Sequence, residues 1–129
     1  MASYEKLLQP LQVAGLRLKN RMLSAPTSLA ELGPGEHYSD DNINYYKLKA
    51  AGGVALVSVG DVIVDLSTGR SHPMQVGLDD PTAIPYLVKM ADAIHSGGAA
   101  PSTPTSAGRW STSTPFLSLI HISEPTRPY

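Results

Sequence analysis

Two Gly-Gly steps, at residues 52–53 and 97–98, constrain this chain most, because each one ends a stretch with helical spacing. The first is followed at once by Val54–Val59, VALVSV, which is almost continuously apolar. A strand that is apolar on both faces belongs in a parallel sheet with both sides covered, since a solvent-facing strand would alternate. The chain is therefore predicted to be an α/β protein.

Helices are predicted before both Gly-Gly steps. The first should begin at Ser39, whose side chain can accept hydrogen bonds from free backbone N–H groups, and it carries Ile43, Tyr46 and Ala50 on one face. The second should be capped near Asp80 or Thr82. Its expected buried stripe is Ile84, Leu87, Val88, Ala91 and Ile94. Strand, helix, Gly-Gly and strand in succession indicate a βα array, with a third strand beginning at Ala99.

The N-terminal part predicts a hairpin followed by a strand that stops abruptly. Leucine and valine lead up to Ala14-Gly15, and beyond it Leu16 and Leu18 alternate with Arg17 and Lys19, which is the period of paired strands. Met22–Ala25 then forms a short strand that ends at Pro26, and Pro26 cannot donate to a sheet ladder. Small residues follow, so this strand end is interpreted as the start of a ligand site. An ordinary turn between strand and loop is the alternative reading.

Two long connections are predicted to be irregular. Leu29–Tyr38 contains Gly33-Pro34-Gly35, and Leu66–Asp79 contains Gly69-Arg70. Loops of this length inside a compact domain are usually functional or mobile.

Composition excludes several classes of function. With no cysteine, the chain has no disulfide and no cysteine-ligated metal, and its histidines lack ligand spacing. A net charge of -1 and 16% charged residues argue against nucleic-acid binding. The apolar run Val54–Val64 is broken by polar residues, and the first ten residues lack a signal-peptide layout, so no membrane span and a cytoplasmic location are expected. Asp61 and Asp65 could look like a pair of catalytic carboxylates. Solvated acidic residues in a loop are the more common case, and the two are interpreted in that way.

The composition shifts sharply after residue 100. Residues 101–116 are dominated by Pro, Ser and Thr, and this bias is typical of a linker or of a corrupted third strand. Leu117–Arg127, LSLIHISEPTR, resembles the in-frame translation of a transposon adapter used in preparing DNA libraries. The expected division is therefore a folded part at 1–100, a biased segment at 101–116 and an adapter-derived artefact at 117–129.

Several motifs in order resemble the N-terminal third of the old yellow enzyme family, close to its NADH:flavin oxidoreductase and 2,4-dienoyl-CoA reductase branch. They are the hairpin, KNR at 19–21, SAPTS at 24–28, VSVGD at 57–61 and DAIHSGGA at 92–99. The resemblance implies a (β/α)₈ or TIM barrel, of which this chain would supply the hairpin and the first two to three βα units. It also implies FMN bound at the C-terminal strand ends, NAD(P)H as reductant and activated C=C bonds as acceptors.

The resemblance assigns five residues to the cofactor site. Ala25, Pro26, Thr27 and Ser28 stand where the family's first strand ends beside the flavin, and Ser28 replaces a Thr or Cys that bonds to it. Gly60 stands at a small residue where a side chain would collide with the flavin ring. The family's catalytic His-x-x-His or His-x-x-Asn pair has no counterpart here, so no catalytic residue is assigned. An iron–sulfur cluster and FAD are expected only in C-terminal regions of longer relatives.

The sequence is accordingly interpreted as an N-terminal fragment of an FMN-dependent oxidoreductase, inactive alone, whose complete form acts on a small-molecule acceptor. A non-enzymatic α/β interaction module is the alternative from another class. A TIM barrel that binds another phosphate-bearing ligand is a third reading. A barrel needs about 250 residues, so this length would leave an open sheet edge and exposed apolar faces.

Overall fold

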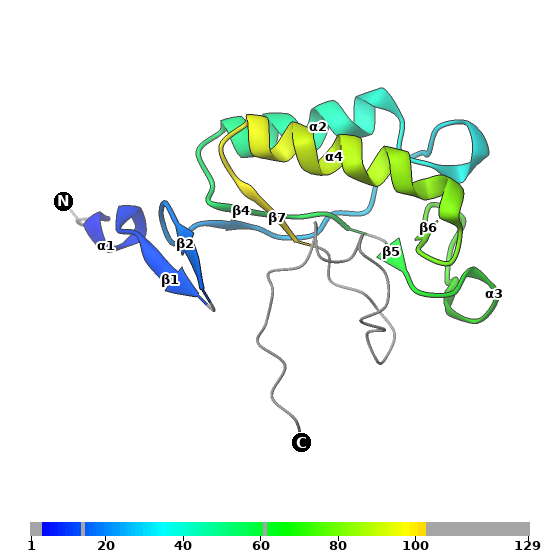
Figure 1. Cartoon of the computed structure of the whole chain (residues 1–129), viewed down its shortest axis with the longest axis horizontal. Helices are drawn as coiled ribbons and strands as arrows, with labels where there is room; N and C mark the ends of the chain where they lie inside the picture. The colour runs from blue at the N-terminus through cyan, green and yellow to red at the C-terminus, as the bar shows by residue number, and fades with distance from the viewer. Residues whose placement is uncertain (1–3, 14, 61, 103–129) are drawn as a thin grey trace, which may run out of the picture.

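Three short parallel strands with two helices on one side form the centre of the molecule (Figure 1). The computed structural model describes residues 4–13, 15–60 and 62–102. The strands are β3 (Leu23–Ser24), β4 (Leu56–Ser58) and β7 (Ala100–Ser102), in the order β3-β4-β7. Leu23 pairs with Leu56, which pairs in turn with Ala100. This βαβαβ arrangement confirms the expected partial α/β barrel.

Helix α2 (Asp40–Ala51) begins where the sequence predicts. The Ser39 hydroxyl accepts a hydrogen bond from the Asn42 N–H at 3.2 Å, and the Asn42 side-chain oxygen accepts one from the Ser39 N–H at 2.9 Å. This reciprocal pair satisfies N–H groups that have no partner within the helix. The predicted face is buried, with Tyr46 and Ala50 fully inaccessible.

Helix α4 (Ile84–Ser96) lies beside α2 and follows a 3₁₀ turn, η2 (Pro81–Ala83). Asp80 caps this turn by accepting the Thr82 N–H at 2.9 Å. The second Gly-Gly step also sets how closely the two helices pack. A Cβ at Gly97 would come within 2.6 Å of the Ala50 Cβ, so only glycine fits there without a shift.

The core lies between the sheet and the two helices. Val57 and Val59 of the β4 segment are buried against side chains of α2 and α4. Members of this core include Ile43, Tyr46, Ala50, Leu87, Met90 and Ile94. Because successive strand residues point to opposite faces, Leu56 and Ser58 face away from the helices. That face corresponds to the interior of a barrel.

The connection after β4 is more ordered than predicted. Leu66–Asp79 was expected to be an irregular loop, but the structure contains α3 (Leu66–Gly69) and a parallel pair of β5 (Val62–Ile63) with β6 (Val76–Gly77). Asp65 caps α3 by accepting the Ser67 N–H at 2.8 Å. Two-residue strands have no readable period, so the sequence does not reveal them.

The N-terminal hairpin is confirmed, with β1 (Leu11–Val13) antiparallel to β2 (Leu16–Leu18), and a short helix, α1 (Glu5–Leu8), precedes it. Buried Asn20 joins the hairpin to the sheet. Its side chain donates to the Gly53 carbonyl at 2.7 Å and accepts the Met22 N–H at 3.0 Å. The start of β3 is thereby fixed to the turn that precedes β4.

The expected linker was wrong at its first two residues, because Pro101 and Ser102 lie in β7. The N–H of Ala100 donates to Ala55, and the carbonyl of Ser102 accepts from Val59. In a parallel pair, every second residue of a strand forms its backbone hydrogen bonds with the same neighbouring strand. Ala100 and Ser102 bond to the β4 segment, so the missing N–H of Pro101 lies on the edge of β7 that faces away from β4.

Asp61 and residues 103–129, including the expected adapter-derived segment, lie outside the described residues. Among the residues that the structure does describe, no helix has the length and apolar character needed to cross a bilayer.

Candidate functional site

The C-terminal ends of β3 and β4 meet at Thr27 and Gly60, two of the five residues expected at the cofactor site. A Cβ placed on Gly60 would lie 2.6 Å from the Thr27 carbonyl oxygen and 2.8 Å from its nitrogen. Real Cβ atoms do not approach backbone so closely. The structure therefore gives a reason for glycine at position 60 that is independent of any ligand.

Two buried tyrosines hold these strand ends together. The Tyr46 hydroxyl donates to the Thr27 carbonyl at 3.0 Å and accepts the Gly60 N–H at 3.0 Å. The Tyr38 hydroxyl donates to the Gly60 carbonyl at 2.9 Å. Sequence reasoning places Tyr46 in the core of α2 but misses this bridge. A buried tyrosine hydroxyl usually has a hydrogen-bond partner, so the sequence could have indicated that Tyr46 forms such a bond, although not with which residues.

The Thr27 side chain is engaged by helix α2. Its hydroxyl accepts from Lys49 Nζ at 2.8 Å, and the same ammonium lies 4.6 Å from the centre of the Tyr45 ring. Hydrogen bonding to Lys49, and secondarily to Thr27, lowers the pKa of Tyr45 below its ordinary value. Thr27 thus contributes backbone to the strand end, while its hydroxyl is already used within the protein.

The remaining expected site residues are exposed at the end of β3. Ala25, Pro26 and Ser28 all present their side chains to solvent. Small side chains leave the backbone approachable, and a serine hydroxyl can donate to or accept from a ligand. One serine hydroxyl beside small, exposed residues fits one edge of a planar cofactor such as a flavin. They supply no charged group for a phosphate.

A second pair of polar groups lies on the sheet face that points away from the helices and corresponds to the barrel interior. Ser58 of β4 and Ser102 of β7 are register partners, and their hydroxyl oxygens are 2.9 Å apart. The sequence does not single them out, because their proximity depends on the pairing of β4 with β7. They add hydroxyl groups to the face that lies opposite the helices.

The loops that follow β3 and β4 are joined by a buried histidine. Thr82 donates its hydroxyl hydrogen to Asp80 at 2.6 Å, so its oxygen must accept from His37 Nε2, which is 2.9 Å away. His37 also stacks on the Tyr86 ring, with 4.7 Å between the ring centres. Hydrogen bonds from the Thr82 side chain and backbone lower the pKa of Asp80 below its ordinary value. An Arg70–Glu36 ion pair at 2.8 Å joins the same two loops.

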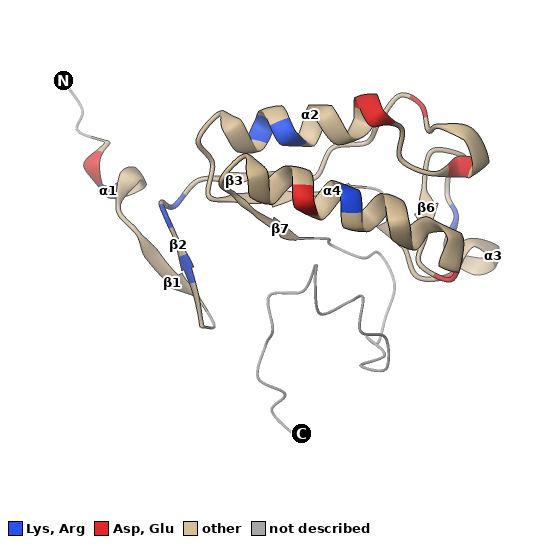
Figure 2. Cartoon of the chain, turned by 45° about the horizontal axis from the view of Figure 1, so that its top comes forward, with Lys and Arg blue, Asp and Glu red and all other residues tan. Residues whose placement is uncertain are grey.

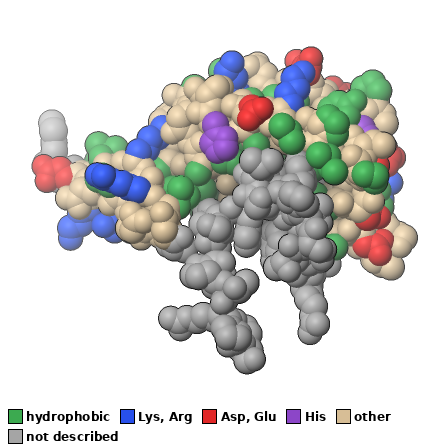
Figure 3. Space-filling model, in the orientation of Figure 1, with side chains coloured by type: hydrophobic (Ala, Val, Ile, Leu, Met, Phe, Trp, Pro, Cys, Tyr) green, Lys and Arg blue, Asp and Glu red, His purple; other side chains and the backbone are tan. Residues whose placement is uncertain are grey.

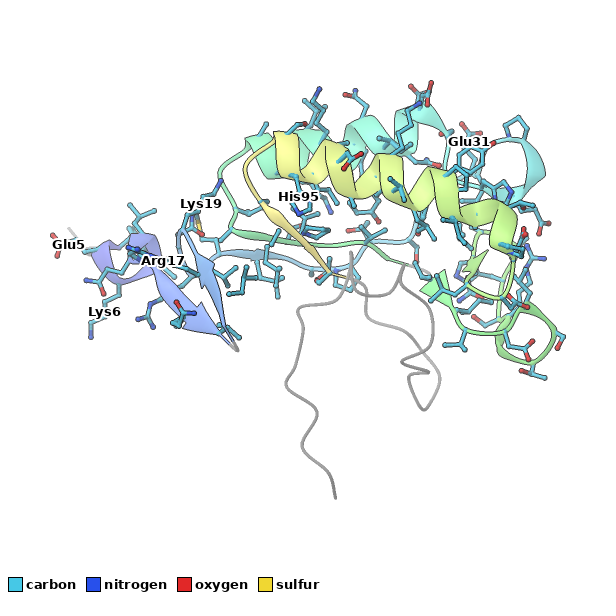
Figure 4. All side chains as sticks on the ribbon, in the orientation of Figure 1. Glu5, Lys6, Arg17, Lys19, Glu31 and His95 are labelled. Atoms are coloured by element: carbon cyan, nitrogen blue, oxygen red, sulfur yellow. The ribbon has the colours of Figure 1, made fainter. Side chains whose placement is uncertain are left out.

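Charge is divided between the two ends of the strands. Arg17, Lys19 and His95 lie at the hairpin end, and Glu31 lies at the opposite end among the connecting loops (Figure 4). Figure 2 shows basic residues on β2 and acidic residues near the start of α2. In the face seen in Figure 3, Lys and Arg side chains likewise gather over the hairpin. Because parallel strands end where the following helices begin, the candidate site lies at the more acidic end.

Comparison with known proteins gives a consistent result. A profile of the NADH:flavin oxidoreductase / NADH oxidase family matches residues 6–101. A metal reductase from Desulforamulus reducens (strain ATCC BAA-1160 / DSM 100696 / MI-1) is 37% identical over 93 residues, which are 72% of this chain and 14% of that protein.

Solved structures show the same fold. A 2-naphthoyl-CoA reductase in complex with 2-naphthoyl-CoA superposes with a TM-score of 0.70 at 28% identity, covering 80% of this chain and 16% of that one. An old yellow enzyme from Pichia sp. AKU4542 superposes with a TM-score of 0.69 at 19% identity, covering 78% of this chain and 26% of that one. The chain thus spans less than a third of each of these three proteins.

Proposed function

The chain belongs to the NADH:flavin oxidoreductase / NADH oxidase family, and from this premise we propose that it is the N-terminal part of an FMN-dependent oxidoreductase. The match over residues 6–101 carries the proposal, because it includes every residue expected at the cofactor site. The ends of β3 and β4 support it, since they bring those residues together as barrel enzymes require.

Residues 25–28 and Gly60 would form one side of the FMN site. In this proposal the exposed Ala25 and Pro26 border the ring, Ser28 offers a hydroxyl to its polar edge, and Gly60 avoids a side chain that would collide with the ring. Bound FMN supplies hydride transfer from NAD(P)H to an activated C=C bond. The chain's own residues bind and orient the ring and exclude water from one side of it.

The rest of the machinery is proposed to lie in further βα units that complete the barrel. Groups that bind the phosphate and a proton donor are assigned there. Any iron–sulfur cluster or FAD would be in regions farther on. Residues 1–100 are proposed as barrel sequence, 101–116 as a corrupted third-strand region and 117–129 as adapter-derived. A cytoplasmic location accompanies this proposal.

The acceptor is proposed to be a small conjugated carbonyl compound or its thioester. The likeness to a 2-naphthoyl-CoA reductase at 28% identity favours the thioester class. The metal reductase relative indicates that other electron acceptors should be tested beside it.

The test begins with the uninterrupted gene, amplified from source DNA with a primer in the Val54–Gly60 coding region. The full-length product should be yellow, release FMN on denaturation and lose its visible absorbance when NADH or NADPH is added without oxygen. An enone or enoyl thioester should then restore the colour. A colourless, stable product would support the interaction module, and a colourless barrel that binds another phosphate ligand would support the third reading.

A further inference from the structure

The backbone N–H and carbonyl of Gly60 are both bonded to side chains. Its N–H donates to Tyr46 and its carbonyl accepts from Tyr38, at 3.0 and 2.9 Å. Glycine has the widest conformational freedom of any residue, so a glycine at a strand end is free to move unless other groups hold it. Here two phenol hydroxyls restrain the two peptide groups on either side of the Gly60 Cα.

The Tyr46 hydroxyl also connects two strands. It has one hydrogen, which it donates to the Thr27 carbonyl, and its oxygen receives the Gly60 N–H. The same oxygen therefore fixes the end of β3 relative to the end of β4. This link lies where Thr27 and Gly60 are in closest contact.

Neither tyrosine reaches the face where a ligand would lie. Tyr46 is 0% exposed and Tyr38 is 2% exposed, and both pack in the core beneath α2 and α4. Any influence on a bound ring must therefore pass through the backbone of Thr27 and Gly60. The residues next to Thr27 in sequence, Pro26 and Ser28, are exposed and would move with it.

We propose that Tyr46 and Tyr38 are positioning residues, which set the affinity of the flavin site by fixing the two strand ends against which the ring lies. The inference rests on the proposed function. It extends the site from five strand-end residues to the buried layer behind them. It also assigns the larger role to Tyr46, because the Tyr46 hydroxyl bonds to both strand ends.

The test uses Tyr46→Phe and Tyr38→Phe in the full-length protein, with Tyr86→Phe as a matched control. Each change keeps the ring and removes one hydroxyl. Tyr86 stacks on His37, whereas the hydroxyls of Tyr46 and Tyr38 bond to Thr27 and Gly60. The FMN dissociation constant of the apoprotein is measured by quenching of flavin fluorescence, and the visible spectrum of the bound flavin is recorded.

Tyr46→Phe should weaken FMN binding by roughly five- to twelvefold, because it removes both hydrogen bonds through which the hydroxyl joins the strand ends. It should also shift the visible absorbance of the bound flavin. Tyr38→Phe should weaken binding less, and Tyr86→Phe should stay within about twofold of the parent protein by the same conversion.

A purely structural role predicts a different result. In that case Tyr46→Phe would lower the unfolding temperature of the apoprotein and the FMN-bound protein equally, with the dissociation constant and spectrum unchanged, and the inference would be overturned. If Tyr46→Phe fails to fold, Tyr38→Phe decides by the same readouts. A parent protein that binds no flavin would overturn the proposed function and the inference together, whereas flavin binding without a tyrosine effect overturns the inference alone.

Discussion

At the scale of single residues, Gly60 cannot accept a side chain unless the backbone beside it shifts. Gly60→Ala would place a methyl group 2.6 Å from the Thr27 carbonyl oxygen, so one of the two strand ends must move. We expect the free energy of unfolding of the full-length protein to fall by about 1–3 kcal/mol, as in other overpacked sites. Urea denaturation followed by circular dichroism measures it.

Gly69→Ala is the matched control for this change. Gly69 has its nearest neighbour, the Ile63 Cβ, at an ordinary 3.8 Å and has no positive φ. It should unfold at the same urea concentration as the parent protein or slightly above it. Equal stability of the two alanine variants would show that the contact between Gly60 and Thr27 is looser than the structure has it.

The Thr82–Asp80 pair makes stability depend on pH in the acid range. The lowered pKa of Asp80 means that its contribution is complete above the ordinary value of 3.8 and is lost as pH falls through the lower folded value. Thr82→Val removes the largest cause of this shift. The difference in unfolding temperature between parent and variant should therefore be greatest above about pH 4 and shrink as pH falls further.

Asp80→Asn provides the background that isolates this effect. In an Asp80→Asn protein, Thr82→Val should change the unfolding temperature by the same amount at every pH, because the titrating group is gone. A pH-dependent effect that survives there would assign the titration to another group.

At the scale of elements, the capping box of α2 gives a direct test of a local sequence signal. Ser39→Ala removes the oxygen that accepts the Asn42 N–H, and we expect a loss of about 1 kcal/mol from the free energy of unfolding. Ser96→Ala, at the C-terminal end of α4, serves as control. Its exposed hydroxyl donates to the Ala93 carbonyl, so its loss should cost under about 0.5 kcal/mol. Similar losses in both variants would contradict a capping role for Ser39.

The elements that the sequence predicts correctly are those whose signals are local. Ser39 caps the helix that follows it directly. Leu87, Ala91 and Ile94 of the stripe predicted for α4 are buried, whereas Ile84 and Val88 are half-buried and buried Met90 was missed. The pairing of β5 with β6 and the Ser58–Ser102 contact depend on residues far apart in the chain. Pro101 led to the wrong prediction of a linker for a related reason. Whether β7 tolerates a proline depends on which edge of the strand faces β4.

The candidate site shows the same division. Ala25–Ser28 and Gly60 were expected as strand ends, and the structure places Thr27 and Gly60 in contact. Their assignment to FMN stays a prediction. The bridge through Tyr46 was not foreseen, since helical spacing shows only that this side chain is buried, not what its hydroxyl contacts.

At the scale of the whole molecule, the sheet has helices on one side only within the described residues. Both long helices cover the same face of β3-β4-β7 (Figure 1). On β3, Leu23 is 56% exposed, which is unusual for a leucine in a parallel strand. In a closed barrel this side chain would face the interior, and both outer strands would have partners.

Residues 4–102 produced alone should therefore be less stable and more prone to self-association than the full-length protein. The uncovered strands offer unpaired backbone groups, and the exposed apolar side chains favour contact between copies. We expect strong binding of a hydrophobic dye, a broad thermal transition and concentration-dependent aggregation by light scattering, whereas the full-length protein should show none of these.

Leu23→Lys should reduce aggregation of the isolated segment and abolish folding of the intact barrel, because a charge tolerated at an open face is costly in a closed interior. A monomeric segment with a sharp transition and no dye binding would instead favour the independent interaction module.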